Sequence, residues 1–167
     1  VLGGTRRIYD DGANDAFGGY GSTIRDNFFS RIKTGVRINV WAESNVVEHN
    51  MCDLECGGTA FIEITTASTD MGLPDVAHTN GNVIAFNRIA VKNYTYGIRV
   101  VGSARRNIGL ANAFWDNLLG TCTAAYRCEM GAEATGGQVY VFGGYNEANA
   151  WLSDPVGTSV VYASNGE

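Results

Sequence analysis

The sequence predicts an all-β fold of short parallel strands wound into stacked coils, and three observations support this. Glycine supplies 22 of the 167 residues and asparagine 15, against only 2 prolines, and both residues tolerate tight left-handed corners. An internal repeat is visible when four segments of the sequence are aligned on one asparagine. Asn-Gly pairs, which typically form two-residue hairpin turns, occur only at 80–81 and 165–166, so hairpins are disfavoured.

Four segments share a mostly apolar pattern around one asparagine. The last three also carry another asparagine five residues earlier, and the aligned asparagines are separated by 23, 37 and 25 residues. A regular repeat of this kind indicates stacked structural units. The segments are 24–29, 47–52, 84–89 and 109–114, aligned on Asn27, Asn50, Asn87 and Asn112, with Asn45, Asn82 and Asn107 as the earlier residues.

A second strand follows each repeat after a turn. Apolar and polar residues alternate in it, as in Ile62, Glu63 and Ile64, which is typical of a half-buried strand. A unit of about 23–25 residues with two or three short strands cannot bury its apolar face alone, but copies stacked on each other can. The sequence therefore predicts a short parallel β-helix of about four to five coils. The second strands are expected at 36–40, 60–64, 96–100 and 124–128.

The chain divides into a lead-in, a set of coils and a less regular end. The long spacing between Asn50 and Asn87 indicates an inserted loop, because this part contains a Met-Gly-Leu-Pro turn signal. We expect a Gly-rich lead-in at 1–21, β-helix coils at 22–134 with the loop insertion at 65–81, and a terminal irregular coil at 135–167.

The recurrent asparagines are expected to form a ladder. When coils stack about 4.8 Å apart, side-chain amides at the same corner can bond to each other and to the turn backbone. We therefore interpret Asn27, Asn50, Asn87 and Asn112 as corner residues and not as a functional site.

Charge and cysteine content narrow the classes of partner. The net charge of −5 disfavours nucleic acid and anionic membranes as partners, and no apolar run approaches the ~18 residues that span a bilayer. The cysteine spacing is too loose for a zinc site and the two histidines show no ligand spacing, so we expect no metal and no cofactor. Buried free thiols are the favoured interpretation and local disulfides the alternative for Cys52, Cys56, Cys122 and Cys128.

The repeats resemble the right-handed parallel β-helix superfamily, in particular the helix region of virus and phage tailspikes and of pectate-lyase-like carbohydrate-active proteins. The run Asn-Val-Ile-Ala-Phe-Asn-Arg-Ile at 82–89, its echo Asn-Val-Val-Glu-His-Asn-Met-Cys at 45–52 and the second strands carry the resemblance, which covers about residues 22–128. It implies a long saccharide ligand on a lateral groove, acidic catalytic residues in the hydrolases and trimeric assembly in many viral members.

Three functions are compatible with this resemblance, because enzymes, adhesins and inert shafts share the fold. The favoured one is a tailspike or tail-fibre module that recognises surface polysaccharide as a homotrimer, on a virion or outside the cell. The alternatives are a polysaccharide lyase or glycoside hydrolase and a non-catalytic structural component. Four or five coils are few for a free-standing enzyme of this class, so we expect a longer spike or stabilising neighbours.

Candidate catalytic residues are the carboxylates Glu63, Asp53 and Asp116. Glycoside hydrolysis uses two carboxyl groups about 5–9.5 Å apart, which corresponds to one or two rungs. Glu63 has an alternative interpretation as the partner of Arg99 in an ion pair between rungs. Alignment of the second strands predicts one outward column that contains Asn39, Glu63, Arg99 and Arg127.

Candidate substrate-binding residues are arginines and aromatic rings. Arg99 and Arg127 could grip acidic sugar groups, and exposed rings such as Trp115, Trp41 and Tyr94 could stack on sugars. Burial against a partner subunit would explain such rings equally well. Further candidate rings are Tyr96, Tyr145 and Trp151, whereas Phe29 and Phe114 are expected in the core in one column with Cys52 and Ile89.

Overall fold

The computed structural model describes residues 21–39, 42–65, 79–102, 104, 106–117, 119–129, 137–154 and 160–162. Within these ranges the chain forms β-strands, turns and bends, and none of the described residues is helical. The all-β prediction is therefore confirmed for this part of the chain. The predicted lead-in, most of the 65–81 insertion and Trp41 lie outside the described residues.

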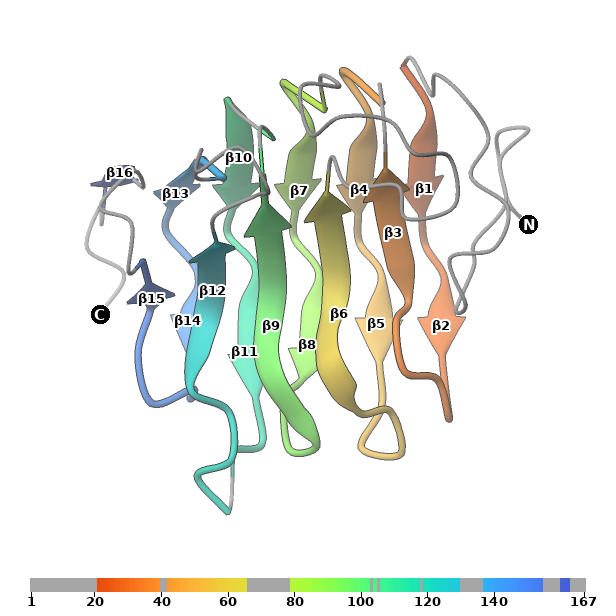
Figure 1. Ribbon diagram of the computed structural model, residues 1–167. Coiled ribbons are helices and arrows are strands. Elements are labelled where there is room, and N and C mark those ends of the chain that lie inside the picture. Colours follow the sequence, from red (N-terminus) through yellow and green to blue (C-terminus); the bar gives the residue numbers. More distant parts are fainter. Residues whose placement is uncertain are drawn as a thin grey trace.

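The strands form three parallel sheets (Figure 1). Sheet I contains β1 (Thr23–Arg25), β4 (Val46–Glu48), β7 (Val83–Ala85), β10 (Asn107–Leu110), β13 (Val139–Phe142) and β16 (Val160–Tyr162). Sheet II contains β2 (Phe28–Phe29), β5 (Met51–Cys52), β8 (Arg88–Ala90), β11 (Ala113–Trp115) and β14 (Tyr145–Asn146). Sheet III contains β3 (Val36–Asn39), β6 (Gly58–Thr65), β9 (Tyr94–Val101), β12 (Ala124–Glu129) and β15 (Leu152–Ser153).

Each coil adds one strand to each sheet in the same order. Coil 1 consists of β1, β2 and β3, coil 5 consists of β13, β14 and β15, and β16 pairs with β13 as the start of a further coil. Every strand pair is parallel and joins neighbouring coils, as between β6 and β9. The stacked repeat predicted from the sequence is therefore confirmed as a parallel solenoid.

A ladder of asparagine side chains marks the corner between sheets I and II. Asn27 Nδ2 donates to Asn50 Oδ1 at 3.0 Å, Asn50 Nδ2 donates to Asn87 Oδ1 at 3.1 Å, and Asn87 Nδ2 donates to Asn112 Oδ1 at 3.0 Å. The predicted ladder is confirmed. The residue before each asparagine has a φ between 48° and 56°, a left-handed corner held by Asp26, His49, Phe86 and Ala111.

A second asparagine ladder marks the other end of sheet I. Asn45 Nδ2 donates to Asn82 Oδ1 at 2.9 Å, and Asn82 Nδ2 donates to Asn107 Oδ1 at 3.0 Å. All three side chains are buried. Buried amides need partners, and each asparagine here both accepts from the coil below and donates to the coil above, so the same residue type fits every rung.

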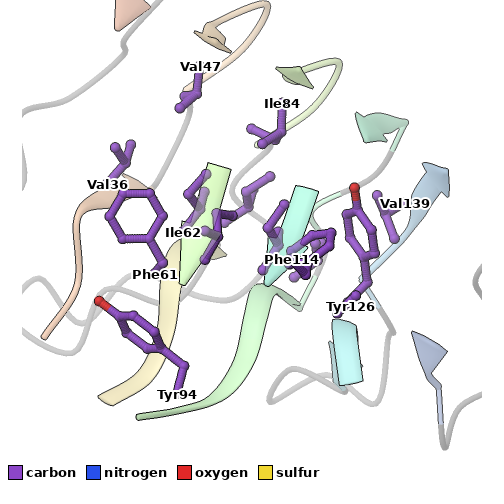
Figure 2. Close-up of a cluster of buried hydrophobic side chains, with 14 of the residues drawn as sticks. Val36, Val47, Phe61, Ile62, Ile84, Tyr94, Phe114, Tyr126 and Val139 are labelled. Atoms are coloured by element: carbon purple, nitrogen blue, oxygen red, sulfur yellow. The ribbon is translucent and has the colours of Figure 1, made fainter. Parts of the chain in front are cut away.

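The core lies between the three sheets (Figure 2). The predicted column is confirmed: Phe29 pairs with Cys52, Cys52 with Ile89 and Ile89 with Phe114. A side chain at Gly97 would overlap the Phe114 ring, so glycine in sheet III makes room for a large ring from sheet II.

The four cysteines are buried free thiols, as the favoured interpretation predicted. Burial raises the pKa of the Cys122 thiol to about 11 and raises that of Cys52 above its ordinary range, because the thiolate loses hydration. Thiols that resist ionisation are weak nucleophiles, so Cys52 and Cys122 act as small core residues.

Candidate functional site

One column of charged residues runs along the outer face of sheet III. In the strand register Arg37 lies beside Glu63, Glu63 beside Arg99, Arg99 beside Arg127 and Arg127 beside Ser153. Neighbouring positions such as Ile62, Ile64, Ile98 and Val100 are buried, so strand alternation turns the charged side chains away from the core.

The register corrects one sequence prediction. Asn39 was expected beside Glu63, but Asn39 pairs with Thr65 and Arg37 occupies the position beside Glu63. A shift of two residues leaves the same side chains facing inward, because strand side chains alternate with a period of two. Alternation alone therefore could not choose between Asn39 and Arg37.

Glu63 lies between two arginines. Its Oε2 accepts from Arg37 Nη2 at 2.9 Å and its Oε1 accepts from Arg99 Nη1 at 3.5 Å, while the Glu63 side chain is only 8% exposed. The ion pair with Arg99 that the sequence suggested is present. Both carboxylate oxygens accept hydrogen bonds, so Glu63 orients two guanidinium groups.

Glu129 extends the same charged network. It accepts from Arg99 Nη2 at 2.6 Å and from Arg127 Nε at 3.3 Å. The hydrogen bond from Arg99 holds the pKa of Glu129 below its usual range, since it stabilises the ionised carboxylate. Arg99 and Arg127 are therefore tied together through one carboxylate.

Arg127 combines a polar and an aromatic contact. Its Nη1 donates to the Ser153 hydroxyl at 2.6 Å, and its guanidinium lies 5.4 Å from the centre of the Tyr96 ring, within the range of a cation–π interaction. Arg99 and Arg127 keep 29% and 23% of their side chains exposed. Sheet III thus presents guanidinium groups in fixed orientations next to the half-buried Tyr96 ring.

Tyr94 does not belong to this face, and its prediction as a sugar-stacking ring is wrong. The side chain is 1% exposed, and its hydroxyl donates to the Ile32 carbonyl at 3.2 Å. The ring packs edge-on against Phe61 in the core (Figure 2). Tyr94 is the first residue of β9 and lies before the strand expected at 96–100, so alternation within that expected strand did not assign its side chain to the inside or the outside.

Trp115 and Asp116 lie together where β11 ends. The Trp115 indole is half-buried, its Nε1 has no hydrogen-bond partner, and the Arg88 guanidinium lies 5.9 Å from its ring centre. Asp116 Oδ2 is also buried without a partner, while the Asp116 backbone N–H donates to Glu147 Oε2 at 2.5 Å. Buried polar atoms without partners on two consecutive residues are uncommon in a folded protein.

Glu147 brings a second carboxylate to this corner. The Tyr145 hydroxyl donates a hydrogen bond to Glu147 Oε1 at 2.5 Å, and this hydrogen bond lowers the pKa of Glu147. Asp116 and Glu147 come from adjacent coils and meet at the Asp116 backbone. We refer to Trp115, Asp116, Tyr145 and Glu147 as the sheet II corner.

Asp53 has a local structural role. Its Oδ1 accepts from the Glu55 backbone N–H at 3.0 Å, which closes the turn between β5 and β6. A hydrogen bond with Ser30 lowers the Asp53 pKa. Asp53 and Asp116 follow β5 and β11, and β8 lies between these strands, so two rungs of about 4.8 Å separate them. That separation is at the upper end of the range expected for two catalytic carboxyl groups, whereas Glu63 lies on sheet III.

Comparison with known proteins gives one partial match. A Kelch motif matches residues 126–155. No curated protein and no solved structure matches the chain. Kelch repeats form the four-stranded blades of β-propellers, whereas the strands within the matched residues, from β12 to β15, lie in three different sheets and pair in parallel with neighbouring coils.

Glu129 and Glu147 were missed as candidates from the sequence. Glu129 lies two residues after Arg127, so alternation along the strand could have placed it on the same face. Glu147 follows a two-residue strand that has no such signal.

No group of three or more potential metal ligands occurs among the described residues. The part of the chain that the structure describes also contains no helix long and apolar enough to span a membrane.

Proposed function

We propose that this protein is a right-handed parallel β-helix module of the tailspike or tail-fibre kind, which recognises a surface polysaccharide, acts on a virion or outside the cell, and assembles as a homotrimer. The three parallel sheets and the repeated coils support the fold part of the proposal. Strand–crossover–strand connections between parallel strands are right-handed in almost all proteins, which supports the handedness.

The observation that carries the proposal is the charged column on sheet III. Glu63 and Glu129 hold the guanidinium groups of Arg99 and Arg127 in fixed orientations, and Tyr96 lies directly beside Arg127. Fixed guanidinium groups suit bidentate hydrogen bonds to carboxylates, and an aromatic ring suits stacking against a sugar face. An extended acidic glycan lying along the stack could therefore contact successive coils.

Tyr96→Ala tests the proposal. We expect the intact chain to bind an acidic capsular or lipopolysaccharide preparation in calorimetry, and Tyr96→Ala to weaken this binding by about tenfold, the effect of one aromatic contact. Tyr145→Ala is the matched control, because Tyr145 is 55% exposed but belongs to sheet II. Equal losses in both variants would contradict a site on sheet III. The absence of glycan binding would favour a purely structural component.

A polysaccharide lyase or glycoside hydrolase is the second candidate, and the sheet II corner favours it. Glycosidases use two carboxyl groups, and Asp116 and Glu147 supply two at one corner, next to the Trp115 ring. The lowered pKa of Glu147 keeps it ionised, as a base or nucleophile requires. An assay for new reducing or unsaturated ends tests this candidate. Asp116→Asn should abolish product formation, and no product from the intact chain would exclude it.

A further inference from the structure

Two of the buried thiols lie on either side of the turn between β5 and β6. Cys52 ends β5, and the Cys56 backbone N–H donates to the Asp53 carbonyl at 3.3 Å, which closes the turn. Both cysteine side chains belong to the hydrophobic core, with 0% and 1% of their surface exposed. The turn therefore directs two thiols, four positions apart in sequence, into the same part of coil 2.

Shared contacts place the two sulfur atoms close together. The Phe29 carbonyl accepts from the Asp53 backbone N–H at 3.2 Å and from the Cys56 thiol at 3.4 Å. The Cys56 sulfur therefore lies beside the peptide bond that joins Cys52 to Asp53. The Cys52 thiol itself lies within hydrogen-bonding reach of Cys56.

The other two cysteines do not form a comparable pair. The Cys122 sulfur lies 3.5 Å from the Ala124 carbonyl, whereas Cys128 lies further along the same extended strand, β12. At about 3.3 Å per residue, the strand from Ala124 to Cys128 spans about 13 Å, and the α-carbons of a disulfide lie within about 7 Å of each other. Coils 2 and 4 are separated by two rungs of about 4.8 Å, which also excludes a bond between the two pairs.

We propose that Cys52 and Cys56 form a reversible disulfide under mild oxidation, and that this bond fixes the turn between β5 and β6. The reaction needs no glycan and no partner chain, so the inference is independent of the proposed glycan site and assembly. Disulfides persist in oxidising environments outside the cell, which is one of the places where the proposed function puts this protein.

Oxidised glutathione is a suitable electron acceptor for this reaction. The Cys56 thiolate attacks one glutathione sulfur, so a mixed disulfide forms and one glutathione leaves as its thiolate. The Cys52 thiolate then attacks the Cys56 sulfur and releases the second glutathione. In total the two cysteines lose two electrons and two protons, and one glutathione disulfide becomes two thiols. Cys56 reacts first because it follows the exposed residues Leu54 and Glu55, whereas Cys52 is held in a strand.

The packing around the pair accommodates the bond but slows its formation. An oxidised Cys56 no longer donates to the Phe29 carbonyl, but this carbonyl still accepts from the Asp53 N–H, so it keeps a partner. Burial raises the pKa of both thiols because the thiolates lose hydration, so few thiolates are present at neutral pH. We therefore expect oxidation over hours, at a rate set by local opening of the turn.

The disulfide should stabilise the fold by a small amount. It restricts the unfolded chain, but the loop that it closes contains only the residues from Cys52 to Cys56, and short loops give the smallest effect. We expect the urea midpoint of the oxidised chain to exceed that of the reduced chain, and dithiothreitol to reverse the difference.

Thiol counting on the full chain tests the proposal. The reduced, folded chain is incubated with oxidised glutathione in the absence of denaturant, then unfolded, alkylated and analysed by mass spectrometry. Of the four cysteines, two should escape alkylation, and the peptide that contains Cys52 and Cys56 should lose two hydrogen atoms. Four alkylated cysteines, a stable glutathione adduct or a bond to Cys122 or Cys128 would overturn the proposal.

Cysteine variants separate this pair from the other thiols. Cys56→Ala should form no disulfide within the chain, whereas Cys122→Ala is the matched control and should still form the bond. Circular dichroism verifies folding, and serine replaces alanine in any variant that is unfolded. Oxidation should raise the urea midpoint of Cys122→Ala and leave that of Cys56→Ala unchanged. A bond that lowers the midpoint would show that the folded turn does not accommodate it, which would also overturn the proposal.

Discussion

The asparagine ladder between sheets I and II lies inside the stack, whereas the charged ladder on sheet III lies outside it. The inner ladder at the corner of sheets I and II consists of asparagine in four successive coils, and Asn50, Asn87 and Asn112 are at most 1% exposed. The outer ladder on sheet III contains Arg37, Glu63, Arg99 and Arg127, and its arginines stay partly exposed. Both ladders connect neighbouring rungs, but they use different chemistry.

The difference follows from what each side chain can pair with. An amide carries a donor and an acceptor, so asparagine stacks on asparagine without limit and without a buried charge. A guanidinium only donates and an ionised carboxylate only accepts, so each arginine needs a carboxylate beside it, and Glu129 supplies one where Arg99 and Arg127 are neighbours. The inner ladder therefore repeats the same residue, whereas the outer ladder needs two residue types.

Asn87→Ala breaks the inner ladder and should have the largest effect on stability. It removes the acceptor of the Asn50 N–H and the Asn50 side-chain amide, both of which stay buried. We expect a loss of about 3 kcal/mol in the free energy of unfolding, measured by urea denaturation. Asn93→Ala is the control and should cost less than about 1 kcal/mol, since Asn93 is exposed. Equal losses would show that the ladder carries no special stability.

Glu63→Gln weakens the outer ladder and should have a smaller effect. The substitution leaves Arg37 and Arg99 facing each other without the intervening negative charge. Because both arginines are partly solvated, we expect a loss of about 2 kcal/mol in the free energy of unfolding. The control is Glu55→Gln, whose exposed pair with Arg31 should contribute nothing measurable. A loss as large as that of Asn87→Ala would remove the distinction between the two ladders.

Glu129→Gln should change the pH dependence of stability and have the smallest effect. The pKa of Glu129 is lowered by its hydrogen bond with Arg99, so the ionised form stabilises the fold above the ordinary glutamate pKa. That contribution is lost as the pH falls through the lowered pKa of the folded state. Between about pH 6 and pH 3, the urea midpoint of the unmodified chain should fall more steeply than that of Glu129→Gln. Parallel curves would contradict this role.

The same contrast explains what could be predicted from the sequence. The inner ladder repeats Asn27, Asn50, Asn87 and Asn112, so alignment on one residue type predicted the stacked coils. The outer ladder does not repeat one residue type in every coil, and its first member was taken as Asn39 although Arg37 occupies that place. The prediction that Glu63 lies beside Arg99 was correct, because the strands of coils 2 and 3 align without a shift.

Corner residues were the least predictable from sequence. Trp115 and Asp116 end β11, and Asp116 has a φ of 64°, so alternation along the strand no longer determines where its side chain points. The contact with Glu147 depends on the register of coil 5, whose sheet II strand contains only Tyr145 and Asn146. The prediction of Tyr94 as a sugar-stacking ring was wrong for a related reason, because Tyr94 begins its strand.

The unequal spacing of the asparagines has a consequence for engineering this protein. Asn50 and Asn87 are 37 residues apart in sequence, Asn87 and Asn112 only 25, yet the two side-chain hydrogen bonds measure 3.1 and 3.0 Å. Extra residues between β6 and β7 therefore leave the register of the stack unchanged, and the entropy cost of a longer connection grows only slowly with length. This connection is a natural place to graft a foreign peptide or a whole domain.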